Sequence, residues 1–284
     1  MANLKEIRNR IASVSSTMQI TSAMKMVSAA KLKKAQDAIT AMRPYADKLT
    51  ELLQNLSATL DADSGSKFSE QRDVKNVLIV AITSNRGLCG AFNSNIIKRA
   101  TVVAESYDAN VSVVAIGKKA NDALSKNFEI ISNQSPVFDD LTFDNVAAIA
   151  EMLMEQFESK AFDKIEVIYN KFKNAATQEI MTEQFLPIEP LEGDTNGNLD
   201  YIFEPSKEEI VETLIPKSLK TQLYKSIRDS FASEHGARMT AMHKATDNAT
   251  ELRDQLKLTY NKARQASITN EILEIVGGAE ALNG

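Results

Sequence analysis

The sequence predicts an α/β domain flanked by two long helices, which pair as an antiparallel coiled coil with the domain at one end. Three observations lead to this fold class. The 10 Gly and 6 Pro of the 284 residues lie mostly between the two ends of the chain. Apolar residues at both ends recur at three- and four-residue steps, and the middle alternates between strand-like and helix-like segments.

Residues 3–60 are predicted to form one long helix. The first Gly is Gly65, and Pro44 is the only Pro before it. Because Gly and Pro are the residues least compatible with a helix interior, the helix is expected to continue unbroken apart from a bend near Pro44. The first apolar residues follow the a and d positions of a heptad: Leu4, Ile7, Ile11, Val14 and Met18. Smaller residues are expected to continue the stripe: Ala23, Met24, Val27, Ala30, Ala35, Ala38 and Met42.

Residues 206–281 are predicted to form the second helix, interrupted by Pro216 and Gly236 alone before Gly277. Its apolar stripe runs through Leu219, Leu223, Ile227, Phe231, Ala245, Ala249, Leu252, Leu256, Tyr260, Ala263, Ile268, Ile272 and Ile275. Because a whole domain separates the two helices, they can pair antiparallel only if that domain sits at one end. A helical bundle inside one compact fold is the alternative that the pattern leaves open.

The middle of the chain predicts a mainly parallel sheet with helices on both faces. Strands are expected at 76–82, 111–116, 128–131 and 165–169, with an antiparallel edge strand at 177–186. Helices are expected at 92–106, 118–126 and 142–158, and a turn or loop at 191–200.

Composition excludes several kinds of chemistry. The single Cys rules out an internal disulfide and a Cys-based zinc cluster, and two His cannot build a multi-histidine metal site. The net charge of −5 argues against a nucleic-acid partner. Charge is uneven: residues 1–60 have nine basic and four acidic side chains, residues 61–206 have 13 and 23, and the remainder has 11 of each.

The loop after the first strand, residues 85–90, lies where a doubly wound sheet often binds phosphate. It lacks the glycine pattern of a dinucleotide site and the Lys of a P-loop, so direct nucleotide binding is not expected. Cys89 is interpreted as a buried structural thiol, and His235 and His243 as helix-surface residues. A regulatory nucleotide-binding module that dimerises through its helices and a generic coiled-coil scaffold are competing hypotheses.

Two helical stretches, 19–28 and 265–271, are rich in Ser, Thr, Met and amide residues and carry little charge. Such faces suit contact with partner proteins. Burial against the same chain is the alternative interpretation.

Four stretches resemble the gamma subunit of the F-type ATP synthase: residues 7–45, 83–93, 233–249 and 260–279. They include Ile20-Thr21-Ser22-Ala23-Met24-Lys25-Met26-Val27, Ser84-Asn85-Arg86-Gly87-Leu88-Cys89-Gly90 and Tyr260-Asn261-Lys262-Ala263-Arg264-Gln265-Ala266-Ser267-Ile268-Thr269. The resemblance spans essentially the whole chain.

The resemblance implies a non-catalytic central rotor shaft without a cofactor. The expected domains are an N-terminal coiled-coil helix at 1–60, a Rossmann-like α/β foot at 61–205 and a C-terminal coiled-coil helix at 206–284. The helices would turn inside a ring of three alpha and three beta subunits, while the foot would bind the epsilon subunit and the membrane c-ring. Proton-driven rotation would then change the affinities of the beta sites during ATP synthesis.

The same resemblance assigns contact residues. Contacts with the alpha/beta ring are expected from Met24, Lys25, Lys31, Lys33, Lys34, Arg264, Gln265, Thr269 and Glu271. Foot contacts with epsilon and the c-ring are expected from Arg86, Tyr201, Phe203 and Glu204. From the residues alone, the lysine cluster would be a solvated helix face. A single Cys excludes the dithiol loop of plastid members, and no transit or signal peptide is visible, so a peripheral protein on the cytoplasmic side of a bacterial inner membrane is expected.

Overall fold

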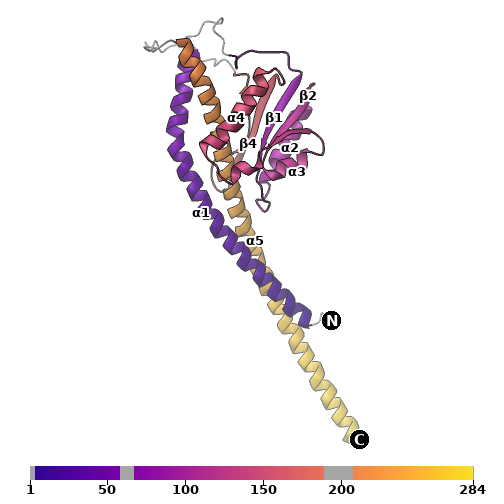
Figure 1. Ribbon diagram of the computed structural model, residues 1–284. Coiled ribbons are helices and arrows are strands. Elements are labelled where there is room, and N and C mark those ends of the chain that lie inside the picture. The colour runs from indigo at the N-terminus through magenta and orange to yellow at the C-terminus, as the bar shows by residue number, and fades with distance from the viewer. Residues whose placement is uncertain (1–3, 58–66, 189–206, 284) are drawn as a thin grey trace. The chain divides into compact units, whose positions relative to one another are not determined.

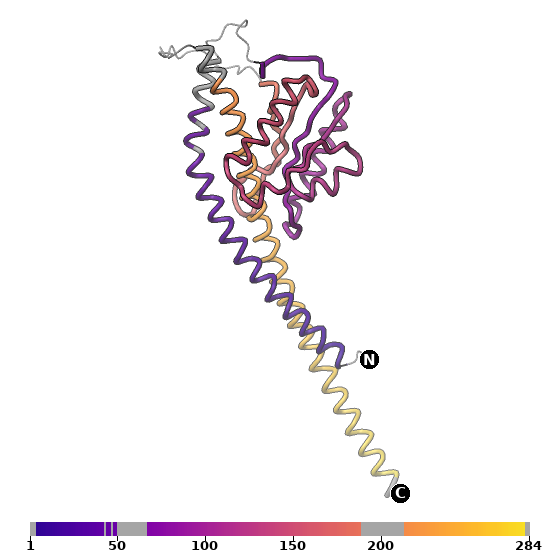
Figure 2. Tube along the Cα trace, viewed as in Figure 1, coloured from indigo at the N-terminus to yellow at the C-terminus, as the bar shows by residue number. Residues whose placement is uncertain are grey.

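The computed structural model describes residues 4–57, 67–188 and 207–283, without the side chains of residues 43, 47, 50–57 and 207–212. Two long helices, α1 (Leu4–Ser57) and α5 (Lys207–Asn283), come first and last along the chain, with the strands and shorter helices between them (Figures 1 and 2). Both predicted helices are therefore confirmed. Pro44 and Pro216 lie inside them, so neither proline ends its helix.

The chain divides into two compact units. Met1–Ser28 and Met239–Gly284 form the first, which we call the terminal unit, and Ala29–Arg238 form the second, the central unit. Each long helix contributes to both units. The domain boundaries expected from the sequence, at 60 and 205, remain predictions.

The central unit contains a five-stranded sheet in the order β3-β2-β1-β4-β5. The strands are β1 (Asn76–Ile82), β2 (Asn110–Ile116), β3 (Glu129–Asn133), β4 (Lys164–Phe172) and β5 (Gln178–Leu186). The first four run parallel and β5 pairs antiparallel with β4, as the sequence predicts. The near-continuous apolar residues of β1 and β2 are buried, as is usual for inner parallel strands.

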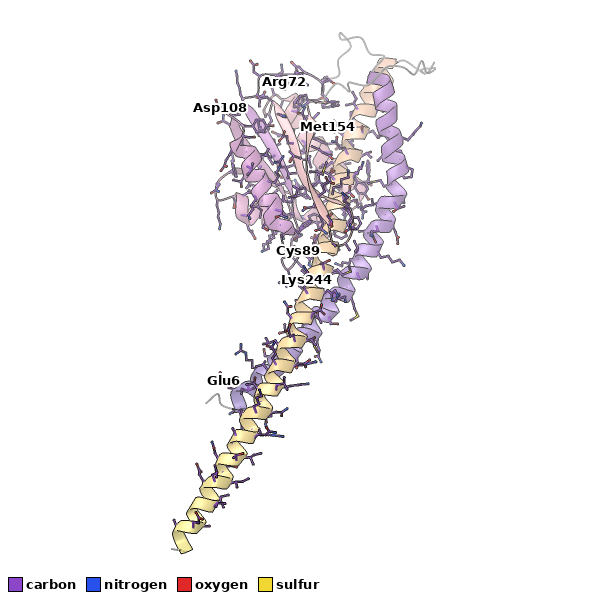
Figure 3. All side chains as sticks on the ribbon, turned by 180° about the vertical axis from the view of Figure 1, so that it is seen from behind. Glu6, Arg72, Cys89, Asp108, Met154 and Lys244 are labelled. Atoms are coloured by element: carbon purple, nitrogen blue, oxygen red, sulfur yellow. The ribbon has the colours of Figure 1, made fainter. Side chains whose placement is uncertain are left out.

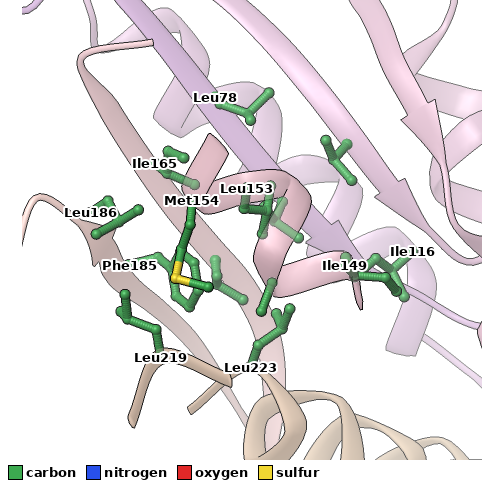
Figure 4. Packing of buried hydrophobic residues seen from close by; sticks show 14 of the residues in the cluster. Leu78, Ile116, Ile149, Leu153, Met154, Ile165, Phe185, Leu186, Leu219 and Leu223 are labelled. Carbon is green, nitrogen blue, oxygen red and sulfur yellow. The ribbon is translucent and has the colours of Figure 1, made fainter. Parts of the chain in front are cut away.

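Helices cover both faces of this sheet. Residues of α2 (Phe92–Glu105) and α3 (Lys118–Leu124) pack with Val77, Ile79 and Ala81 on one face. Residues of α4 (Phe143–Glu158) and α5 pack with the alternate residues of β1 on the other. Figure 4 shows this second layer, where Leu153 and Met154 of α4 and Leu219 and Leu223 of α5 gather over the sheet. A short helix, η2 (Ser135–Phe138), which the sequence analysis missed, follows β3.

In the terminal unit, α1 and α5 pair antiparallel. Arg8 donates to the Tyr260 hydroxyl at 2.7 Å, and Thr21 and Thr246 share a hydroxyl hydrogen bond of 2.8 Å. Lys25 Nζ lies 3.4 Å from His243 Nδ1. Positions in α5 fall as those in α1 rise, which establishes the antiparallel direction.

Beyond Met18 the predicted apolar stripe of α1 is wrong in part, because Ala35 is buried and Met24, Ala38 and Met42 are half-buried, but three other members are not. Ala23, Val27 and Ala30 are exposed, whereas the buried heptad positions pass through Thr21 and Ser28. In α5, Leu252 is likewise exposed and Arg253 is half-buried, with a guanidinium nitrogen 3.5 Å from Met18 Sδ. Hydroxyl groups can occupy these positions because they hydrogen-bond within or across the helices: Thr21 to the Met18 carbonyl and Thr246 to the Met242 carbonyl.

Gly117 connects β2 to α3 at a position that only glycine fits. Its φ is 113°, and a Cβ there would lie 2.3 Å from the Thr83 carbonyl oxygen. Thr83 itself bridges the strands: its N–H donates to the Ile116 carbonyl, and its hydroxyl accepts from the Ala120 N–H. A side chain at Gly117 would therefore displace the end of β1.

We predict that Gly117→Ala lowers the free energy of unfolding by about 3 kcal/mol or more, since it combines a backbone clash with an unfavourable φ. Urea denaturation followed by circular dichroism measures the change. Gly87→Ala is the matched control, because nothing lies within 4 Å of a Cβ at that position. Equal stability of the two variants would contradict this account of Gly117.

Candidate partner-binding site

The C-terminal end of α5 presents apolar side chains to solvent. Ala263 is the last half-buried residue, and every residue from Arg264 to Ala281 is exposed within the described structure. Figure 3 shows side chains standing out around this part of the helix. The large apolar residues here, which we call the C-terminal surface, are Ile268, Ile272, Leu273, Ile275 and Val276, with exposed fractions from 47% to 70%.

The polar residues predicted here are also accessible. Arg264, Gln265, Thr269 and Glu271 are all exposed. Thr269 donates its hydroxyl to the Gln265 carbonyl at 2.9 Å, a contact within the helix. Within the described ranges, the side chains of Arg264, Gln265 and Glu271 make no hydrogen bond or ion pair, so their donors and acceptors are available to another molecule. Exposed apolar area next to free polar groups is typical of protein interaction sites.

A second exposed apolar surface lies on α1, formed by Ile20, Ala23, Met26 and Val27, which we call the N-terminal surface. Ile20 and Val27 are each 57% exposed and Met26 is 64% exposed. The sequence analysis instead selected Met24 and Lys25, both of which are half-buried. The heptad steps that start at Leu4 place residue 25 on the side that faces the partner helix. Residue 26 follows it and faces outward, so the heptad spacing could have identified Met26.

The three lysines of the predicted cluster are exposed, but they differ in their charged neighbours. Lys31, Lys33 and Lys34 lie in the central unit with accessible side chains. Lys31 lies close enough to the buried Glu234 to lower the pKa of that carboxyl, although burial is the largest influence and raises it. Lys33 and Lys34 make no ion pair among the described residues.

Helix α5 contacts the chain at the carboxyl ends of β4 and β1, the two strands between which the strand order reverses. The Ser233 hydroxyl donates to the Asn170 carbonyl at 2.9 Å. Gly236 packs so closely that a Cβ there would lie 3.1 Å from Ala175 Cα. Doubly wound sheets commonly bind ligands at such a reversal of strand order. Here, contacts from α5 lie beside that position.

His235 is buried, which corrects the expectation of a helix-surface residue. Its exposed fraction is 5%, and its ring meets Phe231 edge-on with centroids 4.5 Å apart. Both ring nitrogens lack a hydrogen-bond partner within the described structure. Burial, followed by the positive charges of Arg238 and Lys31, lowers the pKa of His235 to about 3. His243 is exposed, as predicted.

Cys89 is buried, which agrees with its interpretation as a structural thiol. Burial raises its pKa, so the thiol is further from forming a thiolate than a free cysteine. Arg86 is exposed on the adjoining loop. The other predicted foot residues, Tyr201, Phe203 and Glu204, and the predicted 191–200 loop lie outside the described residues.

The described ranges contain no group of three or more His, Cys, Asp or Glu side chains arranged to hold a metal ion. None of their helices has a segment with the length and hydrophobicity needed to cross a bilayer.

We predict that His235→Phe stabilises the protein and reduces its acid sensitivity. The unfolded chain has a His pKa near 6.5, above the folded value, so it binds more protons as pH falls through that range and stability is lost. His235 should account for up to about 2 kcal/mol of the loss between pH 7 and pH 5. Urea unfolding at both pH values measures this, with His243→Phe as the exposed control. Equal pH dependence in wild type and His235→Phe would refute the assignment.

Comparison with known proteins agrees with this arrangement. The family model described as ATP synthase matches residues 3–282. The ATP synthase gamma chains of Flavobacterium psychrophilum and Christiangramia forsetii are 77% and 70% identical, with all of each chain covered. A central stalk/c-ring structure of the Tetrahymena thermophila mitochondrial ATP synthase is 26% identical, with a TM-score of 0.59 over 80% of this chain and 99% of that one. A rotor chain of the Euglena gracilis enzyme has the same fold, with 23% identity and a TM-score of 0.65 over 93% and 98% of the two chains. The chain belongs to the ATP synthase gamma chain family.

Proposed function

We propose that this chain is the central rotor shaft of a proton-translocating ATP synthase. It would transmit rotation of a membrane c-ring to the beta subunits and hold no catalytic residue of its own. The observation that carries this proposal is the C-terminal surface, a group of large apolar side chains that α5 exposes to solvent. Exposed apolar patches of this kind mark sites of contact with another protein. The gamma chain relatives and the similar chains of the mitochondrial central stalk and rotor support it.

A shaft must act on three equivalent sites in turn without stopping at one. It does so when its surface stabilises different ring conformations at different angles, which is a population shift by differential contact. The C-terminal and N-terminal surfaces suit this role because apolar contact is non-directional. A strong buried ion pair at one angle would instead hold the shaft there.

The polar residues around these surfaces would add specific contacts with the ring. Arg264, Gln265, Thr269 and Glu271 would hydrogen-bond to a beta subunit, and the lysines at 31, 33 and 34 would face an acidic loop. Met24 and Lys25 are half-buried, so they would contribute from the edge of the N-terminal surface. Exposed charges of this kind chiefly tune association rate and orientation.

The foot would join the rotor to the membrane. Arg86, on the exposed loop after β1, and Tyr201, Phe203 and Glu204 would contact the epsilon subunit and the c-ring. The protein would then be peripheral on the cytoplasmic side of a bacterial inner membrane, with ATP chemistry confined to its partner subunits.

Co-expression with the alpha and beta subunits tests the proposal. We expect the full chain to give complexes that hydrolyse ATP and rotate. Truncation after Lys262 removes the C-terminal surface but keeps the Arg8–Tyr260 contact, so it should lower torque and turnover while the sheet stays folded. Truncation after Gly278 is the control, because it leaves the five large apolar residues in place. Formation of equally active complexes without the chain would show that it is not the shaft.

We also predict that replacing Lys31, Lys33 and Lys34 together by Glu lowers coupled ATP synthesis roughly tenfold, through repulsion from an acidic partner loop. Membrane vesicles with an imposed proton gradient provide the measurement. The matched control reverses three exposed lysines of the sheet domain, Lys98, Lys118 and Lys126, for the same change in net charge. If the variant with Glu at 31, 33 and 34 synthesises ATP at the full rate, the cluster is an ordinary solvated helix face.

A further inference from the structure

The loop between β1 and α2 has an unfavourable backbone conformation. Leu88 adopts a φ of 62°, in the left-handed region that disfavours a side chain with a Cβ, and is 65% exposed. Gly90 nearby has a φ of 60°. Because Leu88 is largely exposed, its packing does little to compensate for this strain, and the polar contacts of the loop hold it in place.

One set of contacts comes from the first turn of α2. Asn93 accepts from the Ser84 N–H at 2.9 Å and donates its amide to Cys89 Sγ at 3.2 Å. The Ser84 hydroxyl donates to the Arg86 carbonyl at 2.6 Å. These bonds fix the start of the loop and the side chain of Cys89.

The other set comes from α5. Arg238 donates to the Arg86 carbonyl at 3.1 Å and to the Gly87 carbonyl at 3.3 Å. The same guanidinium binds the Glu234 carboxylate at 2.6 Å, one helical turn earlier. Both residues are buried, and their side chains are 8% exposed for Arg238 and 10% for Glu234.

This arrangement uses the properties of arginine. The planar guanidinium presents several donors in a fixed fork, so one face can satisfy a carboxylate while the other spans two successive carbonyls. If either Arg238 or Glu234 is removed, the charge of the other is left buried without a partner. The two side chains therefore depend on each other. Rotation or displacement of α5 at this turn would therefore remove the bonds to both loop carbonyls together.

We propose that Arg238, oriented by Glu234, is a latch that couples the seating of α5 on the sheet to the conformation of the 85–90 loop. With the latch closed, the loop keeps Cys89 inside and displays Arg86 and Leu88. When α5 moves away at this turn, the strain at Leu88 favours opening of the loop. The position of the long helix thus controls which surface the loop presents. Arg238 acts as a positioning residue.

The single cysteine of the chain makes the latch measurable. Cys89 is 1% exposed, so a soluble disulfide reagent such as Ellman's reagent reaches it only when the loop opens. We expect Arg238→Gln, in the full chain, to react about tenfold faster than wild type under native conditions. Glu234→Gln and Arg238→Lys should give intermediate rates, because each keeps part of the contact.

Arg228→Gln is the matched control. Arg228 lies on the same helix and also donates to a loop carbonyl, that of Leu141, but has no contact with the 85–90 loop. Its thiol reactivity should equal that of wild type. An equal increase in Arg228→Gln and Arg238→Gln, or no increase in Arg238→Gln, would overturn the proposal.

A second variant separates loop opening from general destabilisation. Leu88→Asn relieves the strain, because Asn tolerates the left-handed conformation. In the Arg238→Gln background it should return the thiol reaction rate at least halfway to the wild-type value. If Arg238→Gln fails to fold, the same test is made in Arg238→Lys. A rate that stays high after Leu88→Asn would show that loss of Arg238 loosens the whole domain and that no latch exists.

Discussion

The seating of α5 on the sheet is the interaction on which the rest of the structure depends. Leu219, Leu223 and Ile227 complete the apolar layer over β1 and β4, and burial of each such side chain contributes about 1.5–3 kcal/mol. The next turns continue to the carboxyl end of β4, where Ser233 bonds to the Asn170 carbonyl within the strand and Gly236 packs against Ala175 just after it. A helix placed in this way lies beside the position at which other doubly wound sheets bind a ligand. The same placement brings Arg238 to the loop after β1.

Much of the fold follows from local patterns in the sequence. The five strands and the three helices between them lie close to their predicted bounds, because fully buried parallel strands and amphipathic helices have distinct apolar periods. The two long helices follow from the scarcity of Gly and Pro. The first turns of the coiled coil, from Leu4 to Met18, were identified because their heptad positions are apolar.

The errors share one physical cause. A search for apolar residues finds a helix contact only where that contact is apolar, so it passed over Thr21 and Ser28 and moved the stripe to Val27. His235 was placed on the surface for the same reason, since polarity suggests exposure. Burial of Thr21 depends on a tertiary neighbour, the hydroxyl of Thr246, which no local spacing in the sequence encodes. The Phe231 ring that meets His235 lies four residues earlier on α5, so helical spacing could have paired these two side chains.

The polar residues of the candidate partner-binding site follow from the family resemblance and not from apolar spacing. Arg264, Gln265, Thr269 and Glu271 came from the family resemblance, whereas periodicity alone assigned Ile268, Ile272 and Ile275 to the same buried stripe as Leu256. The structure separates the two sets of apolar residues, because the half-buried positions end at Ala263. A heptad pattern reports that a helix face needs a partner but does not say whether the partner belongs to the same chain.

Helix α5 therefore reverses the usual relation between polarity and burial. Its turns from Ser226 to Arg238 bury polar side chains, including Asp229, Ser230, Ser233 and Glu234, whereas its last turns expose isoleucine and leucine. Buried polar groups fix a helix in one position, since each must keep its own hydrogen bonds. Exposed apolar groups impose no such geometry and gain free energy from any surface that removes them from water. The middle of the helix is thus fixed within its own domain, while its C-terminal end is suited to a surrounding surface past which it can turn.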